Sequence, residues 1–170
     1  MEDKDIVQGD RQMTDARRQR RRFLFEELFM CQFYGPEEIR TQLDTFSQDE
    51  DLQEILENRQ LSPEEISALK EKAVRVMERR EELDARIDEV ATGWKTARMG
   101  RPELTLIRQA LYDILYEDSI PYRVAINEAV ELAKVYGGTD APAFVNGVLG
   151  KLVRAMNLAD EQEPAPRDQR

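Results

Sequence analysis

The sequence feature best suited to binding a ligand is a run of five arginines within six positions: Arg17, Arg18, Arg20, Arg21 and Arg22. Guanidinium groups donate paired hydrogen bonds to phosphate and can stack on bases, and successive helical turns would space them along a nucleic-acid backbone. Cations near a helix N-terminus also oppose the helix dipole, a cost that a bound polyanion would relieve. The alternative is a solvated helix face whose arginines pair with Glu26, Glu27 or the acidic middle of the chain.

The charge of the whole chain opposes this interpretation, but its distribution favours it. The 170 residues carry a formal net charge of −10, which would repel phosphate if it were spread evenly. Between Arg11 and Arg22, however, six arginines face one aspartate, whereas residues 37–65 hold ten carboxylates against two arginines. This asymmetry indicates one basic docking surface on an acidic body.

The composition disfavours catalysis and metal binding. The chain has no histidine, and a single cysteine, Cys31, can form neither an internal disulfide nor a thiolate zinc site. We therefore expect no enzyme, no metal and no cofactor. The polar set Asn127, Glu128, Asn146 and Gly147 is better explained by close helix packing than by catalysis.

The sequence also lacks a membrane signal. No apolar run approaches the roughly 20 residues that span a bilayer, and the N-terminus is charged throughout, unlike a secretory signal. We expect no membrane contact and a reducing cytoplasm as the compartment.

The elements that must position the arginines are helices. Phe23, Leu24, Leu28 and Cys31 recur at helical spacing, predicting a first helix from Thr14 or Asp15 to Gly35-Pro36. Residues 36–58 predict one or two short helices. Ser62-Pro-Glu-Glu65 marks the start of a long helix that continues to about Val90.

The second half of the chain predicts three further helices. Gly93 indicates a helix end or kink near Trp94, and Gly100-Arg-Pro102 separates that region from an apolar stripe over residues 104–115. A second stripe follows Pro121, and the last helix spans about Pro142 to Met156. No alternating strand pattern is visible, so we expect an all-α fold. At this length the chain fits one domain.

The sequence resembles the NusB family of bacterial transcription antitermination factors. Ala16, Arg17, Arg18 and Arg21 match the family's opening arginine pattern, and residues 119–137 with Phe144-Val-Asn-Gly-Val-Leu match its C-terminal signature. The resemblance implies a compact NusB-like domain of two packed three-helix bundles over residues 14–157. A disordered arm at 1–13 and a disordered tail at 158–170 would flank it.

The resemblance also implies RNA-contacting residues. The family's arginine motif contacts boxA RNA, which makes Arg17, Arg18 and Arg21 stronger candidates than Arg20 and Arg22. The family also places an acidic residue and a phenylalanine at the RNA surface, here Asp140 and Phe144. The alternative for this pair is that Asp140 caps the final helix while Phe144 fills the core. Ala143 stands where the family often has lysine, which predicts weaker RNA binding or a different sequence preference.

The function implied by the resemblance is non-catalytic. The protein would bind single-stranded boxA-like RNA with NusE, a small-subunit ribosomal protein, and help the RNA polymerase antitermination complex resist termination during ribosomal RNA synthesis. The acidic middle region could attract the basic NusE, and some family members form homodimers that would mask the arginines. Two alternatives stay open: a helical protein-interaction module, and a NusB-like RNA-targeting subunit for ribosomal RNA modification.

Overall fold

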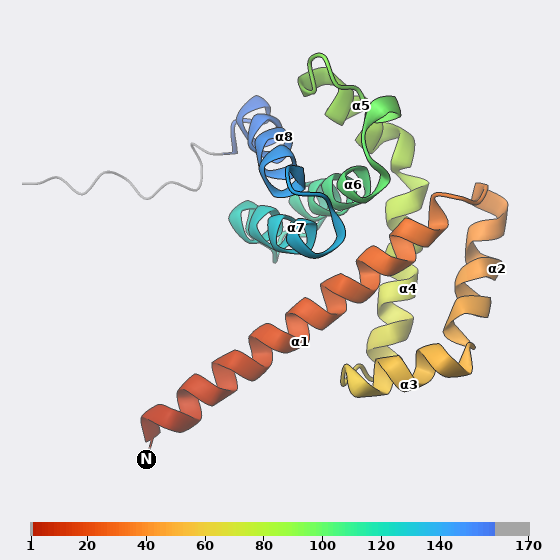
Figure 1. The fold of residues 1–170 in the computed structure, drawn as a ribbon, viewed down its shortest axis with the longest axis vertical. Coiled ribbons are helices and arrows are strands. Elements are labelled where there is room, and N and C mark those ends of the chain that lie inside the picture. Colours follow the sequence, from red (N-terminus) through yellow and green to blue (C-terminus); the bar gives the residue numbers. More distant parts are fainter. Residues whose placement is uncertain (1, 159–170) are drawn as a thin grey trace, which may run out of the picture. The chain divides into compact units, whose positions relative to one another are not determined.

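The computed structural model describes the backbone of residues 2–158 and the side chains of residues 15–158. This part of the chain is built of α-helices and contains no strand, which confirms the all-α prediction (Figure 1). The helices are α1 (Glu2–Cys31), α2 (Pro36–Ser47), α3 (Glu50–Asn58), α4 (Pro63–Glu78), α5 (Arg80–Val90), α6 (Arg101–Tyr116), α7 (Tyr122–Tyr136) and α8 (Ala141–Ala155), with the short 3-10 helix η1 (Thr96–Arg98) before α6. The predicted tail lies outside the described residues, apart from Leu158.

The chain divides into two compact units, Met1–Arg80 and Glu81–Arg170. In the first unit α1, α2 and α4 pack on one another, and α3 packs on α2. In the second unit α6, α7 and α8 pack on one another. Each unit therefore contains a three-helix core, as the family resemblance implies, and α3 and α5 are additional helices.

Helix α1 buries the face that the sequence predicts. Phe23, Leu24, Leu28 and Cys31 are all at most 2% exposed. The predicted helix start at Thr14 or Asp15 is wrong, because α1 begins at Glu2 and residues 2–13, expected to form a disordered arm, are helical. This segment has one glycine, no proline and several good helix formers, so a helix nucleated by the packed part of α1 can propagate toward the N-terminus.

The start of α4 follows its sequence signal, but the helix is shorter than predicted. Ser62 accepts a hydrogen bond from the Glu65 backbone N–H, and the Glu65 carboxylate accepts one from the Ser62 N–H, which closes a capping box. The predicted long helix to Val90 is interrupted at Arg79, between α4 and α5. The apolar stripe has no member between Met77 and Leu83, so no buried side chain holds a continuous helix there.

The core of the first unit joins α1 to α3 and α4. Phe23 packs with Leu52, Leu56 and Leu61, and its ring stacks on Phe46 with the ring centroids 6.4 Å apart. Asp49 caps α3 by accepting a hydrogen bond from the Leu52 N–H. These contacts fix the middle of α1, and with it the direction of the arginine-bearing turns that precede Phe23.

The second unit is centred on α6, in which every residue from Leu104 to Asp113 is buried. Arg108 of α6 donates two hydrogen bonds to Asp84 of α5, each 2.7 Å long, from Nε to Oδ1 and from Nη2 to Oδ2. The last helix begins and ends one residue before the predicted bounds, which is within the usual uncertainty of helix ends.

Candidate nucleic-acid interface

The five arginines of α1 differ in exposure. Arg17 and Arg18 are exposed, whereas Arg20, Arg21 and Arg22 are partly buried. At 100° per residue, Arg17 and Arg21 fall in line with Leu24 and Leu28, while Arg18 falls in line with the buried Phe25 at the edge of the same face. The side that packs into the core further along α1 thus presents cations two turns earlier.

Arg20 is held by the first turn of α4. Its Nη1 donates a hydrogen bond to Glu65 Oε1 at 3.0 Å. The pKa of Glu65 is lowered, chiefly by the hydrogen bond from the Ser62 backbone and further by Arg20, while partial burial works in the opposite direction. Glu65 therefore has two roles, since it closes the capping box of α4 and neutralises one arginine of the cluster.

Arg22 is also close to a carboxylate. Its Nε lies 3.5 Å from Glu26 Oε1, one turn further along α1. Glu26 is occupied by Arg59, which donates from Nη1 to Oε2 at 2.7 Å and from Nη2 to Oε1 at 3.0 Å. The proposed pairing of the arginines with acidic neighbours thus holds for Arg20 and Arg22, the two weaker RNA candidates.

Glu27, which the sequence suggested as an ion-pair partner for the arginines, forms no hydrogen bond to any of them. The residue is completely buried, and neither carboxyl oxygen has a hydrogen-bond partner among the described residues. Burial raises its pKa to about 8, although Lys70 acts in the opposite direction. Sequence reasoning missed this site, and the only available signal was that Glu27 lies one helical turn after the core residue Phe23 and one turn before Cys31.

Asp140 and Phe144 come together at the start of α8. Asp140 occupies the N-cap position, but its side chain makes no capping hydrogen bond, and the residue is exposed. Phe144, one turn later, is partly buried instead of filling the core, and Ala143 is exposed. Asp140 therefore stands at the N-cap without the side-chain bond that the alternative requires, and Phe144 is only partly buried.

The neighbouring polar residues also differ from the prediction. Asn127, Asn146 and Gly147 are exposed, and a Cβ added at Gly147 would meet no atom within 4 Å. Close helix approach therefore does not explain Gly147.

The arginines and the Asp140–Phe144 pair belong to different units, the first and the second respectively. Within the described residues, no group of three or more acidic or cysteine side chains could hold a metal ion. No described helix is long and apolar enough to cross a membrane.

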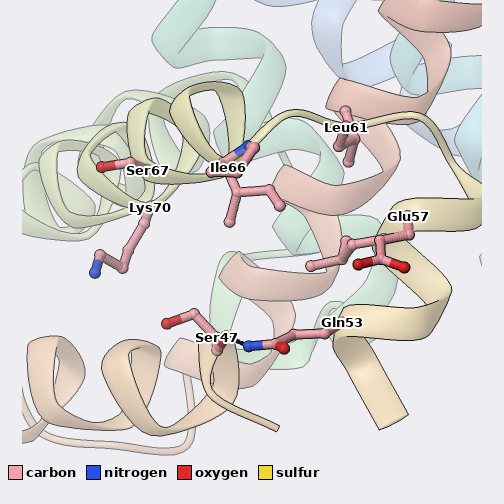
Figure 2. Close-up of a pocket in the computed structure, with 9 residues that line it drawn as sticks. Ser47, Gln53, Glu57, Leu61, Ile66, Ser67 and Lys70 are labelled. Atoms are coloured by element: carbon pink, nitrogen blue, oxygen red, sulfur yellow. Dashed lines mark hydrogen bonds between the residues drawn. The ribbon is translucent and has the colours of Figure 1, made fainter. Parts of the chain in front are cut away.

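A cavity of about 450 Å³ opens in the first unit between the end of α2, α3 and the start of α4 (Figure 2). Leu56, Leu61 and Ile66 supply its apolar surface, and Gln53 Nε2 donates to the Ser47 carbonyl at 3.5 Å on one side. Lys70 also lines the cavity, and its Nζ donates to Asp44 at 2.6 Å. Because its one ammonium group already has a carboxylate partner, the cavity offers no charge for phosphate.

A comparison with protein families decides the affiliation of this chain. The model of the NusB family matches residues 18–154, which is more than half of the sequence and includes most of the arginine cluster, Asp140 and Phe144. The chain belongs to the NusB family. The family match is therefore not limited to the two sequence motifs, because it runs from α1 in the first unit to α8 in the second.

Individual relatives agree with this assignment. The transcription antitermination protein NusB of Agathobacter rectalis is 45% identical over 75% of this chain and 92% of the relative. The NusB of Lachnoclostridium phytofermentans is 36% identical over 81% of this chain and 98% of the relative. The family consists of transcription antitermination factors and not of enzymes, so the chain is a NusB-type transcription antitermination protein.

Solved structures show the same fold. A structure of T. maritima NusB superposes with a TM-score of 0.62 at 28% identity, covering 81% of this chain and 90% of that chain. A structure described as a plectonemic RNA supercoil contains a chain with a TM-score of 0.64 at 23% identity, covering 84% of this chain and 96% of that chain. At that identity the second likeness carries the fold alone.

Proposed function

We propose that this NusB-type protein binds boxA-type single-stranded RNA together with NusE, and that the assembly suppresses termination while RNA polymerase transcribes ribosomal RNA in the cytoplasm. The observation that carries the proposal is the division of the arginine cluster. Arg20 and Arg22 lie against Glu65 and Glu26, whereas Arg17 and Arg18 are exposed. The arginines that match the family motif include the two exposed cations of the cluster.

The proposed chemistry is binding without reaction. Arg17, Arg18 and Arg21 contact phosphates, and a guanidinium plane can also stack on an unpaired base. Phe144 offers part of a ring face for a second base, and Asp140 accepts hydrogen bonds from base amino groups. Arg20 and Arg22 contribute less to RNA binding, because each already lies near a carboxylate.

The test is RNA affinity at several salt concentrations, measured with and without NusE, for the wild type and an R17A/R18A/R21A variant. We expect NusE to strengthen RNA binding by the wild type. The variant should bind RNA more weakly, and its plot of log affinity against log salt concentration should be less steep by about 2, because three phosphate contacts are lost. The control is an R40A/R75A/R79A variant, which also removes three arginines from the same unit, all of them exposed. Equal losses in both variants would point to non-specific attraction, and absence of RNA binding in the wild type with NusE would favour a protein-interaction module.

NusE is proposed to dock on the acidic surface of α2 to α4. Glu65 and Glu71 are unsuitable for testing this, because Glu65 closes the capping box and Glu71 accepts a hydrogen bond from Arg40. Glu54, Glu57 and Glu64 are exposed. Their simultaneous replacement by lysine should weaken NusE binding while RNA binding by the isolated protein is kept, and unchanged NusE affinity would exclude this surface.

A further inference from the structure

The connection between α5 and α6 carries a second group of basic and aromatic side chains. Trp94, the only tryptophan of the chain, is 48% exposed. The guanidinium carbon of Arg98 lies 4.9 Å from the centroid of its ring, and Lys95 and Arg98 are both exposed. Trp94 therefore presents a half-exposed aromatic ring beside two exposed cations.

The connection is held in place from several sides. Ala91 and Met99 are buried at its two ends, and Gly93 has a φ of +83°, which a residue with a side chain rarely adopts. The Asp88 carboxylate accepts hydrogen bonds from the Thr96 N–H at 2.7 Å and from the Thr96 hydroxyl at 3.0 Å. The segment between the anchors is thus fixed before any partner arrives, which lowers the entropy cost of binding.

The charge of this connection contrasts with the rest of the chain. Residues 91–102 contain Lys95, Arg98 and Arg101 and no carboxylate, in a protein of net charge −10. The nearby Asp88 is engaged by Thr96, and the Lys95 ammonium donates to the Asp88 backbone carbonyl at 2.6 Å. An ammonium group has three donors, so Lys95 can also bond an anion.

We propose that the Trp94–Arg98 surface is a second contact site for single-stranded RNA, an inference that rests on the proposed RNA-binding function. Every base has a face that can stack on an indole ring, and every nucleotide brings a phosphate for Lys95 or Arg98. An acidic peptide would satisfy the cations but would leave the indole ring without a matching flat surface. The combination of ring and cations therefore favours a nucleotide chain over an acidic protein.

Trp94 itself provides the readout, because its emission reports this surface alone. A boxA-type single-stranded RNA should quench the fluorescence of the full-length wild type in a saturable manner. In binding measured with labelled RNA, W94A should lose about tenfold in affinity, and W94F should lose less because a phenyl ring still stacks. K95A/R98A should make the plot of log RNA affinity against log salt concentration less steep by about 1.4.

The matched control is an R86A/K134A variant, which removes two ion-paired cations from the same unit and should leave the slope unchanged. If R17A/R18A/R21A abolishes RNA binding while saturating RNA leaves the Trp94 emission of the wild type unchanged, the proposed function stands and this inference fails. If poly-glutamate quenches Trp94 as strongly as RNA does, the surface is a protein-docking site instead. Thermal melts of W94A and W94F show whether any loss reflects unfolding.

Discussion

Arg108 of α6 and Glu27 of α1 are both buried ionisable residues, but among the described residues only Arg108 has a hydrogen-bond partner. Arg108 is 9% exposed and donates two hydrogen bonds to Asp84. Glu27 is fully buried, and its carboxyl oxygens have no hydrogen-bond partner in the described part of the chain. Arg108 of the second unit therefore has its charge satisfied, whereas the first unit keeps a carboxyl group that is stable there mainly in its neutral form.

The difference shows that burial alone does not decide whether a charged residue stabilises or destabilises the folded protein. Removing one member of a satisfied pair leaves the other without its partner, whereas removing an unsatisfied acid relieves a cost that the fold already bears. Three substitutions test this comparison.

The largest effect is expected for R108A. The substitution removes both hydrogen bonds to Asp84 and empties a buried volume, so we expect a loss of about 4 kcal/mol in the free energy of unfolding. Chemical denaturation followed by the fluorescence of Trp94, which lies in the same unit, measures this loss. A loss below about 1 kcal/mol would mean that the pair stabilises the second unit no more than a surface contact does.

The next effect has the opposite sign and depends on pH. With a pKa of 4.5 in the unfolded chain and about 8 in the folded protein, Glu27 takes up a proton on folding between these pH values, so wild-type stability falls as pH rises from about 4.5 to about 8. E27L abolishes this fall, and we expect it to be about 3 kcal/mol more stable than the wild type at pH 7.

Denaturation of both proteins at several pH values checks this prediction. The advantage of E27L should be small near pH 4.5 and grow toward pH 8. If the stability difference between E27L and the wild type stayed constant over this range, burial would not raise the pKa of Glu27 in the folded protein. E27Q is the companion variant, because it removes the ionisation while it keeps a polar side chain in place.

The smallest effect is expected for K134A. Lys134 donates to Glu131 at 2.7 Å, but both side chains are exposed, at 56% and 43%. Exposed pairs of this kind contribute little, so stability should change by less than about 0.5 kcal/mol in the same denaturation assay. If K134A lost as much stability as R108A, burial would not explain why the Arg108–Asp84 pair is expected to contribute more than the Lys134–Glu131 pair.

Sequence patterns predicted the parts of the fold that depend on local spacing. The buried stripe of α1 and the Ser62–Glu65 start of α4 follow from helical periodicity and from capping chemistry within four residues. The interruption at Arg79 was missed because no glycine or proline marks it. It follows instead from the absence of a buried residue between Met77 and Leu83.

The candidate site was predictable in its residue types but not in the state of each residue. Whether an arginine of α1 is exposed depends on partners far away in sequence, such as Glu65 for Arg20. The same holds for Glu27, whose burial is set by helices that pack against α1. The partial burial of Phe144 and the absence of a capping bond from Asp140 likewise depend on tertiary packing, which spacing along one helix does not reveal.

The burial of Cys31 gives the protein a built-in label for one of its units. This sole cysteine is inaccessible, and burial together with Glu27 raises the pKa of its thiol to about 12. A thiol reagent can therefore modify it only after the first unit opens. Trp94, the sole tryptophan, belongs to the second unit. Thiol modification and tryptophan emission, followed in the same unmutated sample, would thus reveal whether the two units unfold together or one before the other.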